Sequence, residues 1–540
     1  MKTFKNLLSV MTAKETIIAG KAILGIEFGS TRIKAVLIDG ENKPIAQGSH
    51  TWENQNVDGI WTYGIDRIWY GLQDCYADLR KNVIEQFDCE IEHLAGIGIS
   101  AMMHGYMAFG QDDKILIPFR TWRNTNTGKA AAELSKLFNY NIPLRWSISH
   151  LYQCILEDMP HVKEITYLTT LAGYIHWRLT GKKVIGVGDA SGMIPVDPKT
   201  KTYDAEMVRK FDELVAPKGY GWKLLDILPE SLSAGEDAGT LTAHGAERLD
   251  ISGHLKPGCP LCPPEGDAGT GMVATNAVKQ RTGNVSAGTS SFSMIVLEKE
   301  LSKPYECLDM VTTPDGSLVA MVHCNNCTSD INAWVKVFKE YAELLGVDQD
   351  TNTLYTRLFQ IADKGDADCG GLISYNYISG EPITGCMDGR PLVLRSASDK
   401  LTLANFMRAH LYGAIAVLKF GNDILFKEEN VKVDRITGHG GYFTTPVVGQ
   451  KMLAAALNSP ISVMETAGEG GAWGIALLAA YVVNNHQGLT LPEWLDDVVF
   501  AGNTGSSVDP NPADVEGFNV YIENYKACLP AEQAAVECKK

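Results

Sequence analysis

Two acidic residues, Glu265 and Asp267, lie in a stretch of Gly, Ala, Pro and Thr, "CPPEGDAGTGMVATNA" at residues 262–277. Such a stretch offers little bulk that could bury a carboxylate. A turn is one explanation, because an Asp side chain can hydrogen-bond its own backbone at the end of a strand. The other explanation is a carboxylate placed for chemistry. Which of the two holds depends on what else the chain supplies.

Two similar stretches supply candidate anion sites. "ILGIEFGSTRIKAVLID" begins at Ile23 and "TGNVSAGTSSFSMIVLE" covers 282–298, and each is typical of two strands joined by a turn. The turn residues are Gly29, Ser30 and Thr31 in the first stretch and Gly288, Thr289 and Ser290 in the second. Backbone N–H groups and short hydroxyls of such turns converge on anions, so two of them can grip a polyphosphate from both sides. We expect a positive φ at Gly288. Plain strand connections are the alternative.

A third small-residue stretch, "ITGHGGYFTTP" at 436–446, contains Gly438, Gly440 and Gly441. Glycines let a backbone approach a flat or anionic ligand closely. The spacing is not the G-x-G-x-x-G of dinucleotide folds. Nucleotide contact and simple termination of a strand are both open for this stretch.

The elements that position these groups follow from hydrophobic periodicity. We expect strands around a turn at 95–109, a strand entering a glycine turn at 433–441, and helices at four ranges: 132–140, 166–181, 405–425 and 469–483. The helix at 166–181 should stop at Gly181. Mixed strands and helices predict α/β domains, and the repeated hairpin predicts two of them that flank a central cleft.

Composition bounds the class of protein. The chain has 540 residues, of which 45% are hydrophobic and 21% charged, which predicts two or more globular domains without a disordered linker. The net charge of −16 argues against a nucleic-acid partner. The apolar run at 471–483 is shorter than the roughly 20 residues that span a bilayer, so we expect no membrane segment.

The 12 cysteines are expected to be reduced thiols of a cytoplasmic protein. Two C-x-x-C pairs occur, Cys259/Cys262 and Cys324/Cys327, but they are too far apart for a zinc ribbon, so we predict no metal there. The first 22 residues do not form the apolar core of a signal peptide. Their spacing predicts a short N-terminal helix.

Taken in order, the motifs resemble the FGGY family of carbohydrate kinases from residue 23 to about 525. The hairpins are similar to the two phosphate motifs of the family, and "PEGDAGTGMVA" is similar to its G-G-x-D catalytic loop. The other matching stretches are "YIHWRLTGKKVIGVGDASGMIPVD", "ISGEPIT", "TGHGGYFTTPVVGQKMLAAALNSPI" and "EGGAWGIALLAA".

The resemblance implies two actin-like (ribonuclease H-like) ATPase domains: an N-terminal domain at 23–275, after an extension at 1–22, and a C-terminal domain at 276–540. It also implies ATP and Mg²⁺ as cofactors and a small sugar as substrate. The residues that it places in a site are Asp267 as general base, Glu27 toward hydrated Mg²⁺, Met103, His104 and Trp122 on the sugar, and the glycine-rich residues named above on the nucleotide.

Within the family, "MMHGYM" resembles xylulokinase, so the resemblance implies a ketopentose, with D-xylulose ahead of L-ribulose. Four residues depart from the family pattern: Glu27 stands for Asp, Asn124 and Asn126 stand for the acid and Arg of W-x-D-x-R, and Ile383 stands for the Arg of G-E-R-x-P. An actin-like or Hsp70-like ATPase that acts on a protein partner is the alternative from another class. A homodimer is a further hypothesis, and Glu265 has no assigned role.

Overall fold

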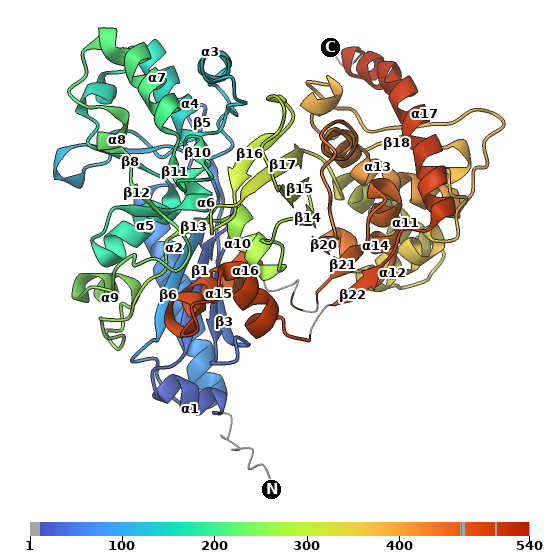
Figure 1. Ribbon diagram of the computed structural model, residues 1–540. Helices are drawn as coiled ribbons and strands as arrows, with labels where there is room; N and C mark the ends of the chain where they lie inside the picture. The colour runs from blue at the N-terminus through green and yellow to red at the C-terminus, as the bar shows by residue number, and fades with distance from the viewer. Residues whose placement is uncertain (1–10, 465, 467–469, 503–504, 539–540) are drawn as a thin grey trace, which may run out of the picture. The chain divides into compact units, whose positions relative to one another are not determined.

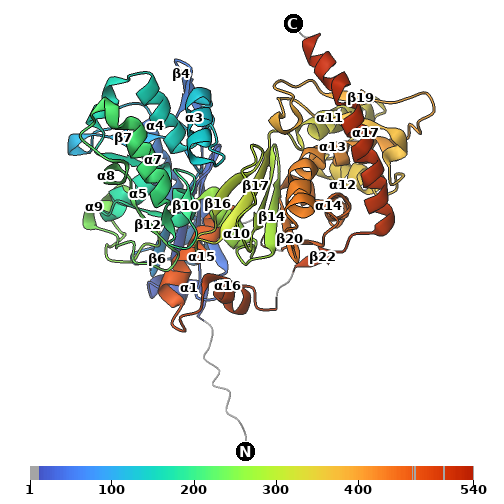
Figure 2. The same cartoon turned by 45° about the horizontal axis from the view of Figure 1, so that its top comes forward.

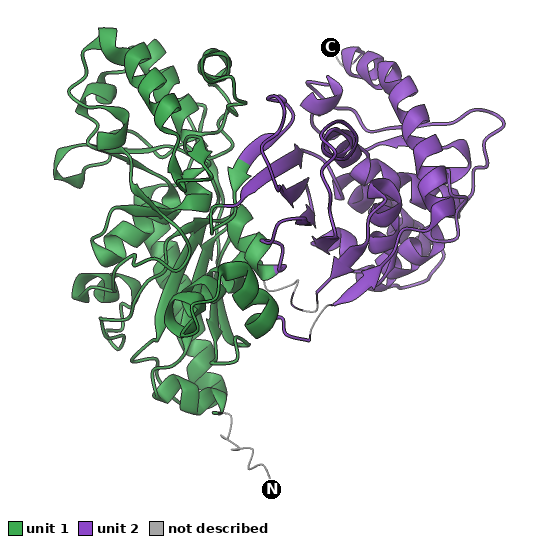
Figure 3. Ribbon diagram, viewed as in Figure 1, with its two compact units in different colours: residues 1–274, 311–316, 469–499 green, residues 275–310, 317–468, 500–540 purple. Residues whose placement is uncertain are grey.

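The structure is a computed structural model that describes residues 11–464, 466, 470–502 and 505–538. The chain divides into two compact units, coloured in Figure 3. Unit 1 comprises 1–274, 311–316 and 469–499, and unit 2 comprises 275–310, 317–468 and 500–540. The predicted domain boundary at 275/276 lies one residue from the first of these limits, but the units are not continuous in sequence as the prediction drew them.

Unit 1 is built on a five-stranded sheet (Figure 1), and the order of its strands is β3–β2–β1–β6–β13. The strands are β1 (Ile23–Phe28), β2 (Arg32–Ile38), β3 (Pro44–Thr51), β6 (Gly96–Ala101) and β13 (Glu265–Gly266). Strands β1, β2 and β3 are antiparallel neighbours, whereas β6 and β13 continue the sheet in parallel with β1. The first hairpin is therefore the start of this sheet, as predicted.

Unit 2 repeats this arrangement. Its seven-stranded sheet has the order β16–β17–β15–β14–β20–β21–β22. The strands are β14 (Thr282–Ala287), β15 (Ser291–Val296), β16 (Asp309–Thr312), β17 (Leu318–Cys324), β20 (Arg435–His439), β21 (Ile461–Val463) and β22 (Ser506–Val508). Strands β14, β15 and β17 are antiparallel, and β20 and β21 follow in parallel with β14. The five central strands thus have the order and directions of the sheet in unit 1.

Helices cover both sheets. Those of unit 1 are α1 (Ala13–Ile18), α2 (Ile65–Phe87), α3 (Gly128–Phe138), α4 (Ser147–Leu156), α5 (Leu171–Thr180), α6 (Val187–Ala190), α7 (Ala205–Val215), α8 (Leu224–Ile227), α9 (Ala243–Leu249), α10 (Asp267–Ala274), α15 (Gly470–Asn484) and α16 (Leu491–Trp494). Those of unit 2 are α11 (Ser329–Leu344), α12 (Thr351–Ala362), α13 (Leu403–Asp423), α14 (Val448–Leu457) and α17 (Pro512–Glu537).

Short strands complete the units. In unit 1 they are β4 (Gln55–Val57), β5 (Ile60–Thr62), β7 (Met107–Phe109), β8 (Tyr167–Thr169), β9 (Val184–Gly186), β10 (Val196–Asp197), β11 (Thr202–Tyr203) and β12 (Glu230–Leu232). In unit 2 they are β18 (Ile373–Tyr375) and β19 (Leu392–Leu394).

Glycines let helix α15 lie directly on the unit 1 sheet, where it contacts β1 and β6 (Figures 1 and 2). A Cβ at Gly25 of β1 would lie 2.1 Å from the carbonyl oxygen of Ala472, and one at Gly98 of β6 would lie 2.4 Å from that of Ile475. On the helix, a Cβ at Gly474 would lie 2.0 Å from the carbonyl oxygen of Thr270 in α10. Close backbone packing therefore fixes α10, α15 and the sheet against one another.

One predicted helix is shorter than expected. The range 166–181 begins with β8, and helix α5 starts only at Leu171 because the hydroxyl of Thr170 caps it by accepting from the N–H of Gly173. The helix ends at Gly181, which has a φ of 81°, as predicted. Most of the predicted N-terminal helix lies outside the described residues, and α1 follows it.

No helix among the described residues has both the length and the apolar character of a membrane span.

Candidate active site

The sequence predicts a loop around Asp267, but in the structure Asp267 lies where a strand meets a helix. Strand β13 ends at Gly266, and Asp267 is the first residue of helix α10. Its Oδ1 atom accepts a hydrogen bond from the backbone N–H of Met103 at 3.1 Å, and its side chain is partly exposed. Burial raises its pKa to about 6, although the N–H groups of Met103 and Ala268 oppose that shift. Asp267 is thus a fixed carboxylate with a raised pKa.

Glu27 lies near the end of the central strand β1, between Lys34 of β2 and Ser100 of β6. It is partly exposed. Desolvation raises its pKa to about 7, the charge of Asp267 adds to the increase, and Lys34 opposes it. Glu27 and Asp267 therefore interact electrostatically, which the resemblance implied by placing both in one site.

The sequence interpretation missed Asp189, in the short helix α6 of the same unit. Asp189 is 1% exposed. Burial raises its pKa to about 7, and the charge of Asp267 adds to the increase, whereas the hydrogen bond from the Thr170 hydroxyl lowers the pKa. That hydroxyl donates to Oδ2 at 2.6 Å, while Oδ1 is buried and has no partner among the described residues. The only sequence signal was its position in "GDASG", a stretch that we had matched without assigning the acid.

Glu265, to which we had assigned no role, is a buried clamp. Its oxygens accept from the backbone N–H groups of Gly188 at 3.2 Å and Asp189 at 2.8 Å, and it is 1% exposed. A Cβ at Gly186 would lie 2.2 Å from one Glu265 oxygen, and a Cβ at Gly188 would lie 2.5 Å from the other. The carboxyl thus occupies space that two glycines leave, and burial holds its pKa well above the ordinary value.

Met103 and His104 follow strand β6, at the edge of the sheet where Asp267 lies. Both side chains are buried. His104 has a φ of 71°, and its Nδ1 atom lies 3.2 Å from the carbonyl oxygen of Gly192. A carbonyl can only accept, so Nδ1 carries the proton of this hydrogen bond. A Cβ at Gly192 would lie 2.6 Å from Nδ1, so this glycine permits the contact.

Trp122, which we predicted to contact the sugar, is hydrogen-bonded to the first hairpin. Its Nε1 atom donates to the hydroxyl of Ser30 at 3.1 Å, and its ring is partly buried. The nearby departure Asn124 has a structural explanation, because its amide donates to the Trp61 carbonyl at 2.7 Å and accepts from the Trp61 N–H at 2.9 Å. An ionised Asp could not donate the first of these bonds. Asn126 is exposed.

Each turn is closed by a backbone hydrogen bond from its first glycine, but the bond spans four residues in unit 1 and three in unit 2. The N–H of Gly29 donates to the carbonyl of Arg32 at 3.0 Å, and the N–H of Gly288 donates to that of Ser290 at 2.9 Å. Neither glycine has a positive φ, so our expectation for Gly288 is wrong. A three-residue connection brings the strands together without a left-handed residue at its first position. A Cβ at Gly288 would have no atom within 4 Å, so the space beside it is open.

The three glycines after β20 differ in what they do. A Cβ at Gly438 would lie 2.6 Å from the ring of Phe443, so this glycine makes room for an aromatic side chain. Gly440 has a φ of 98° and would place a Cβ 2.6 Å from the carbonyl oxygen of Ala287. Gly441 faces open space, as a residue that admits a ligand must. The structure therefore gives packing reasons for Gly438 and Gly440.

Glu381 of "ISGEPIT" is a second buried carboxyl clamp, in unit 2, that the sequence interpretation did not identify. It is 1% exposed, and burial raises its pKa to about 7. Its oxygens accept from the N–H of Asn326 at 2.8 Å and from the N–H of Asn325 at 3.2 Å. Ile383, which stands for Arg in this motif, is partly buried.

The C-x-x-C pairs are free thiols in the structure. Burial raises the pKa of Cys259 to about 11 and that of Cys327 to about 12, and it also raises those of Cys262 and Cys324. The described residues contain no group of three or more His, Cys, Asp or Glu side chains that could hold a metal ion. Glu27 and Asp267 are nevertheless oxygen donors of the kind that suits a hydrated Mg²⁺.

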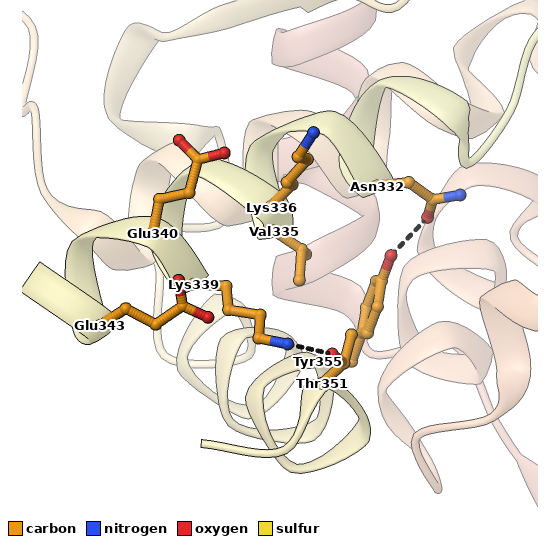
Figure 4. A pocket seen from close by; sticks show the side chains of 8 residues that line it. All are labelled: Asn332, Val335, Lys336, Lys339, Glu340, Glu343, Thr351 and Tyr355. Atoms are coloured by element: carbon orange, nitrogen blue, oxygen red, sulfur yellow. Dashed lines mark hydrogen bonds between the residues drawn. The ribbon is translucent and has the colours of Figure 1, made fainter. Parts of the chain in front are cut away.

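The helices α11 and α12 of unit 2 enclose a separate hollow of about 380 Å³ (Figure 4). Its lining includes Lys336 and Lys339 with Glu340 and Glu343, and the hydroxyl of Tyr355 donates to Asn332 at 2.8 Å. None of the residues predicted to form the site lines it. We therefore assign it no part in the chemistry.

Comparison with known proteins gives two family matches. The N-terminal domain of the FGGY family of carbohydrate kinases matches residues 22–254, and its C-terminal domain matches residues 283–483. A relative, the xylulose kinase of Haemophilus influenzae, is 22% identical over 519 residues, which cover 93% of this chain and 98% of that protein.

Solved structures show the same architecture. A ligand-bound xylulose kinase from Lactobacillus acidophilus has a TM-score of 0.76 at 20% identity, and a gluconate kinase from the same organism has 0.76 at 19%. Each comparison covers 95% of this chain and 99% of the other. At these identities the likeness establishes the fold, which is the two-domain actin-like ATPase fold that the sequence predicted.

Proposed function

Because the chain belongs to the FGGY family of carbohydrate kinases, we propose that it transfers the γ-phosphate of ATP to a hydroxyl of a ketopentose, with D-xylulose ahead of L-ribulose. Membership of the family makes the chain a sugar kinase. The ketopentose is the finer part of the proposal. A relative that this chain matches over 93% of its length, and a solved structure that it matches over 95%, are both described as xylulose kinases, which supports it.

The observation that carries the proposal is the position of Asp267. Its carboxyl is fixed by the Met103 N–H and has a pKa of about 6, and the residue is partly exposed. A base with such a pKa is largely ionised at neutral pH and can still accept a proton. In the proposed reaction Asp267 takes the proton of the sugar hydroxyl as that oxygen attacks the γ-phosphorus and the β–γ bridging bond breaks.

The neighbours of Asp267 have separate roles in this proposal. Met103 and His104 contact the sugar, and the ring of Trp122 packs against the sugar. Glu27 would hold a hydrated Mg²⁺ through its water ligands. That ion would supply positive charge for the phosphate oxygens when it is bound.

The nucleotide is assigned to the small-residue turns. We propose that Gly29, Ser30 and Thr31 of unit 1 contact phosphate, and that Gly288, Thr289 and Ser290 of unit 2 do the same. Gly441, whose surroundings are open, is proposed to admit the adenosine, while Gly438 and Gly440 shape that turn. The buried thiols fit a reducing compartment, so we propose a cytoplasmic enzyme, and a homodimer stays a hypothesis for solution measurements.

The experiment that tests the substrate should include gluconate, because a gluconate kinase matches the fold as well as a xylulose kinase does. ADP release should be measured with D-xylulose, L-ribulose, gluconate and glycerol at equal concentrations, with and without Mg²⁺. The proposal predicts the highest kcat/KM for a ketopentose. Preference for gluconate would replace the substrate, and ADP release that no sugar stimulates would favour an ATPase acting on a protein partner.

A further inference from the structure

The three carbonyl oxygens of the first turn are all engaged by neighbouring residues of unit 1. The indole N–H of Trp52 donates to the carbonyl of Gly29 at 2.8 Å, and the hydroxyl of Tyr63 donates to that of Ser30 at 2.6 Å. The backbone N–H of Trp52 donates to the carbonyl of Thr31 at 3.1 Å. The rings of Trp52 and Tyr63 stack with their centres 4.1 Å apart, so the two donors support each other.

The direction of a carbonyl fixes the direction of the next N–H. In a planar trans peptide the C=O of one residue and the N–H of the following residue point in opposite directions. Holding the carbonyls of Gly29 and Ser30 toward Trp52 and Tyr63 therefore turns the N–H groups of Ser30 and Thr31 away from these donors. In the part of the chain that is described, neither N–H has an acceptor.

The second turn has the same property through different chemistry. The carbonyl of Gly288 accepts from the backbone N–H of Thr328 at 2.9 Å and from its hydroxyl at 2.7 Å. The carbonyl of Thr289 accepts from the backbone N–H of Cys327 at 2.9 Å. By the same peptide geometry the N–H groups of Thr289 and Ser290 point away from this segment, and neither finds an acceptor among the residues that the structure describes.

The segment that holds the second turn is itself anchored. The side chain of Asn376 donates to the carbonyl of Cys327 at 2.9 Å, and the buried carboxyl of Glu381 binds the N–H groups of Asn325 and Asn326. The second C-x-x-C stretch and the "SGEP" stretch thus meet at this turn. Their contacts give these residues a structural role at the turn.

We propose that Trp52, Tyr63 and Thr328 are positioning residues for phosphate binding: by holding the turn carbonyls, they leave each turn with N–H donors alone on its ligand side. The inference rests on the proposed function, since it takes the ligand to be a nucleotide phosphate. A carbonyl oxygen turned toward phosphate would repel it, whereas two aligned N–H groups form an anion-binding concavity. Orientation before binding also removes the entropic cost of ordering the turn.

Tyr63→Phe tests the proposal at one atom, because it keeps the ring that stacks on Trp52 and removes the donor to Ser30. Isothermal titration with ADP and with adenosine separates the phosphates from the nucleoside. We expect ADP affinity to fall about fivefold, the value of one hydrogen bond, with adenosine affinity unchanged. In kinetics, the KM for ATP should rise while the KM for the sugar stays the same.

Tyr76→Phe is the matched control, since its buried hydroxyl has no partner in the described chain, and it should leave ADP binding unchanged. Thr328→Val repeats the test in unit 2 by removing one of the two donors to Gly288. Equal losses for ADP and adenosine, or no loss in Tyr63→Phe and Thr328→Val, would overturn the positioning role. A native chain that binds no ADP and phosphorylates no sugar would instead overturn the proposed function.

Discussion

Four carboxyl groups of unit 1 form an electrostatically linked series: Glu27, Asp267, Asp189 and Glu265. Glu27 and Asp267 are partly exposed, whereas Asp189 and Glu265 are 1% exposed. Burial raises all four pKa values, and the charge of Asp267 raises those of both Glu27 and Asp189. The partly exposed pair is the one that we propose to act on a ligand, and the buried pair shapes the structure around it.

Asp189→Asn tests the buried pair through the pH dependence of stability. Burial raises the pKa of Asp189 to about 7 from an ordinary value of 3.8, so the folded chain keeps a proton that the unfolded chain loses. The stabilisation from that proton is complete below pH 3.8 and is lost as the pH rises through about 7. Asn is neutral throughout, so the Tm of the variant relative to that of the native chain should be higher at pH 8 than at pH 5.

Thermal melts at the two pH values check this expectation, with the exposed Asp112→Asn as a control that should show no such difference. A Tm difference for Asp189→Asn that is the same at pH 5 and pH 8 would contradict a proton held by this carboxyl in the folded chain.

His104→Asn tests the sugar side. Asn tolerates the positive φ of 71° at this position better than other residues do, so the backbone should be preserved. Loss of the imidazole should lower kcat/KM for the sugar. The lost transition-state stabilisation should be about 1–3 kcal/mol, the cost of leaving a substrate hydroxyl unpaired, with the KM for ATP unchanged. Unchanged sugar kinetics with a lower Tm would make His104 a core residue.

Sequence reasoning identified residues whose motif carried a role, and it missed those whose role comes from a fold contact. Asp267 and Glu27 were named, and the structure links them electrostatically. Asp189 and Glu381 were missed because their significance depends on partners distant in the chain, such as Asp267 and Asn326. Trp52 and Tyr63, which donate to the turn carbonyls, could not be identified from the sequence, since neither aromatic residue is unusual in a core.

Among the elements, helix α15 contacts the parts of unit 1 that carry Glu27 and Asp267. Helix α15 contacts β1 and β6, and the N–H of Ala472 in its first turn hydrogen-bonds Glu27. Its Gly474 lies against α10, the helix that Asp267 begins. The position of helix α15 therefore influences both of the partly exposed carboxylates, Glu27 and Asp267.

Gly474→Ala should disturb this packing. Its Cβ would lie 2.0 Å from the backbone oxygen of Thr270, which cannot move without shifting α10. Overpacking of this kind costs about 1–3 kcal/mol, and we expect a lower Tm together with a lower kcat. Gly128→Ala, where the new methyl group meets nothing within 4 Å, is the control and should preserve both. A variant with native Tm and kcat would contradict the packing account.

Element prediction succeeded where the pattern was strong. The two hairpins, helix α13 and helix α15 are long or repeated and agree with the expected ranges. The range 166–181 was only partly right because Thr170 caps α5 and so leaves β8 as a separate strand. The predicted positive φ of Gly288 was wrong because residue type alone does not set the geometry of a three-residue connection.

At the level of the whole chain, the repeated hairpin was the signal that gave the architecture. Both units have the same order of five central strands, with three antiparallel and two parallel. The return of 469–499 to unit 1 could not be deduced from the pattern, because an apolar helix can pack on either sheet. Only the glycines of β1 and β6 show which sheet accepts it at backbone distance.

Kinase activity requires the sugar, the nucleotide and one base to act together, and Asp267→Asn tests that requirement most directly. The substitution keeps the size of the side chain and removes its basicity. With the preferred sugar of the native chain, kcat should fall about 10²–10⁴-fold, while titration shows sugar and ATP still binding and the Tm is nearly unchanged. Near-native phosphorylation by Asp267→Asn would contradict its role as the base, and a loss of activity that only follows a loss of Tm would make Asp267 structural.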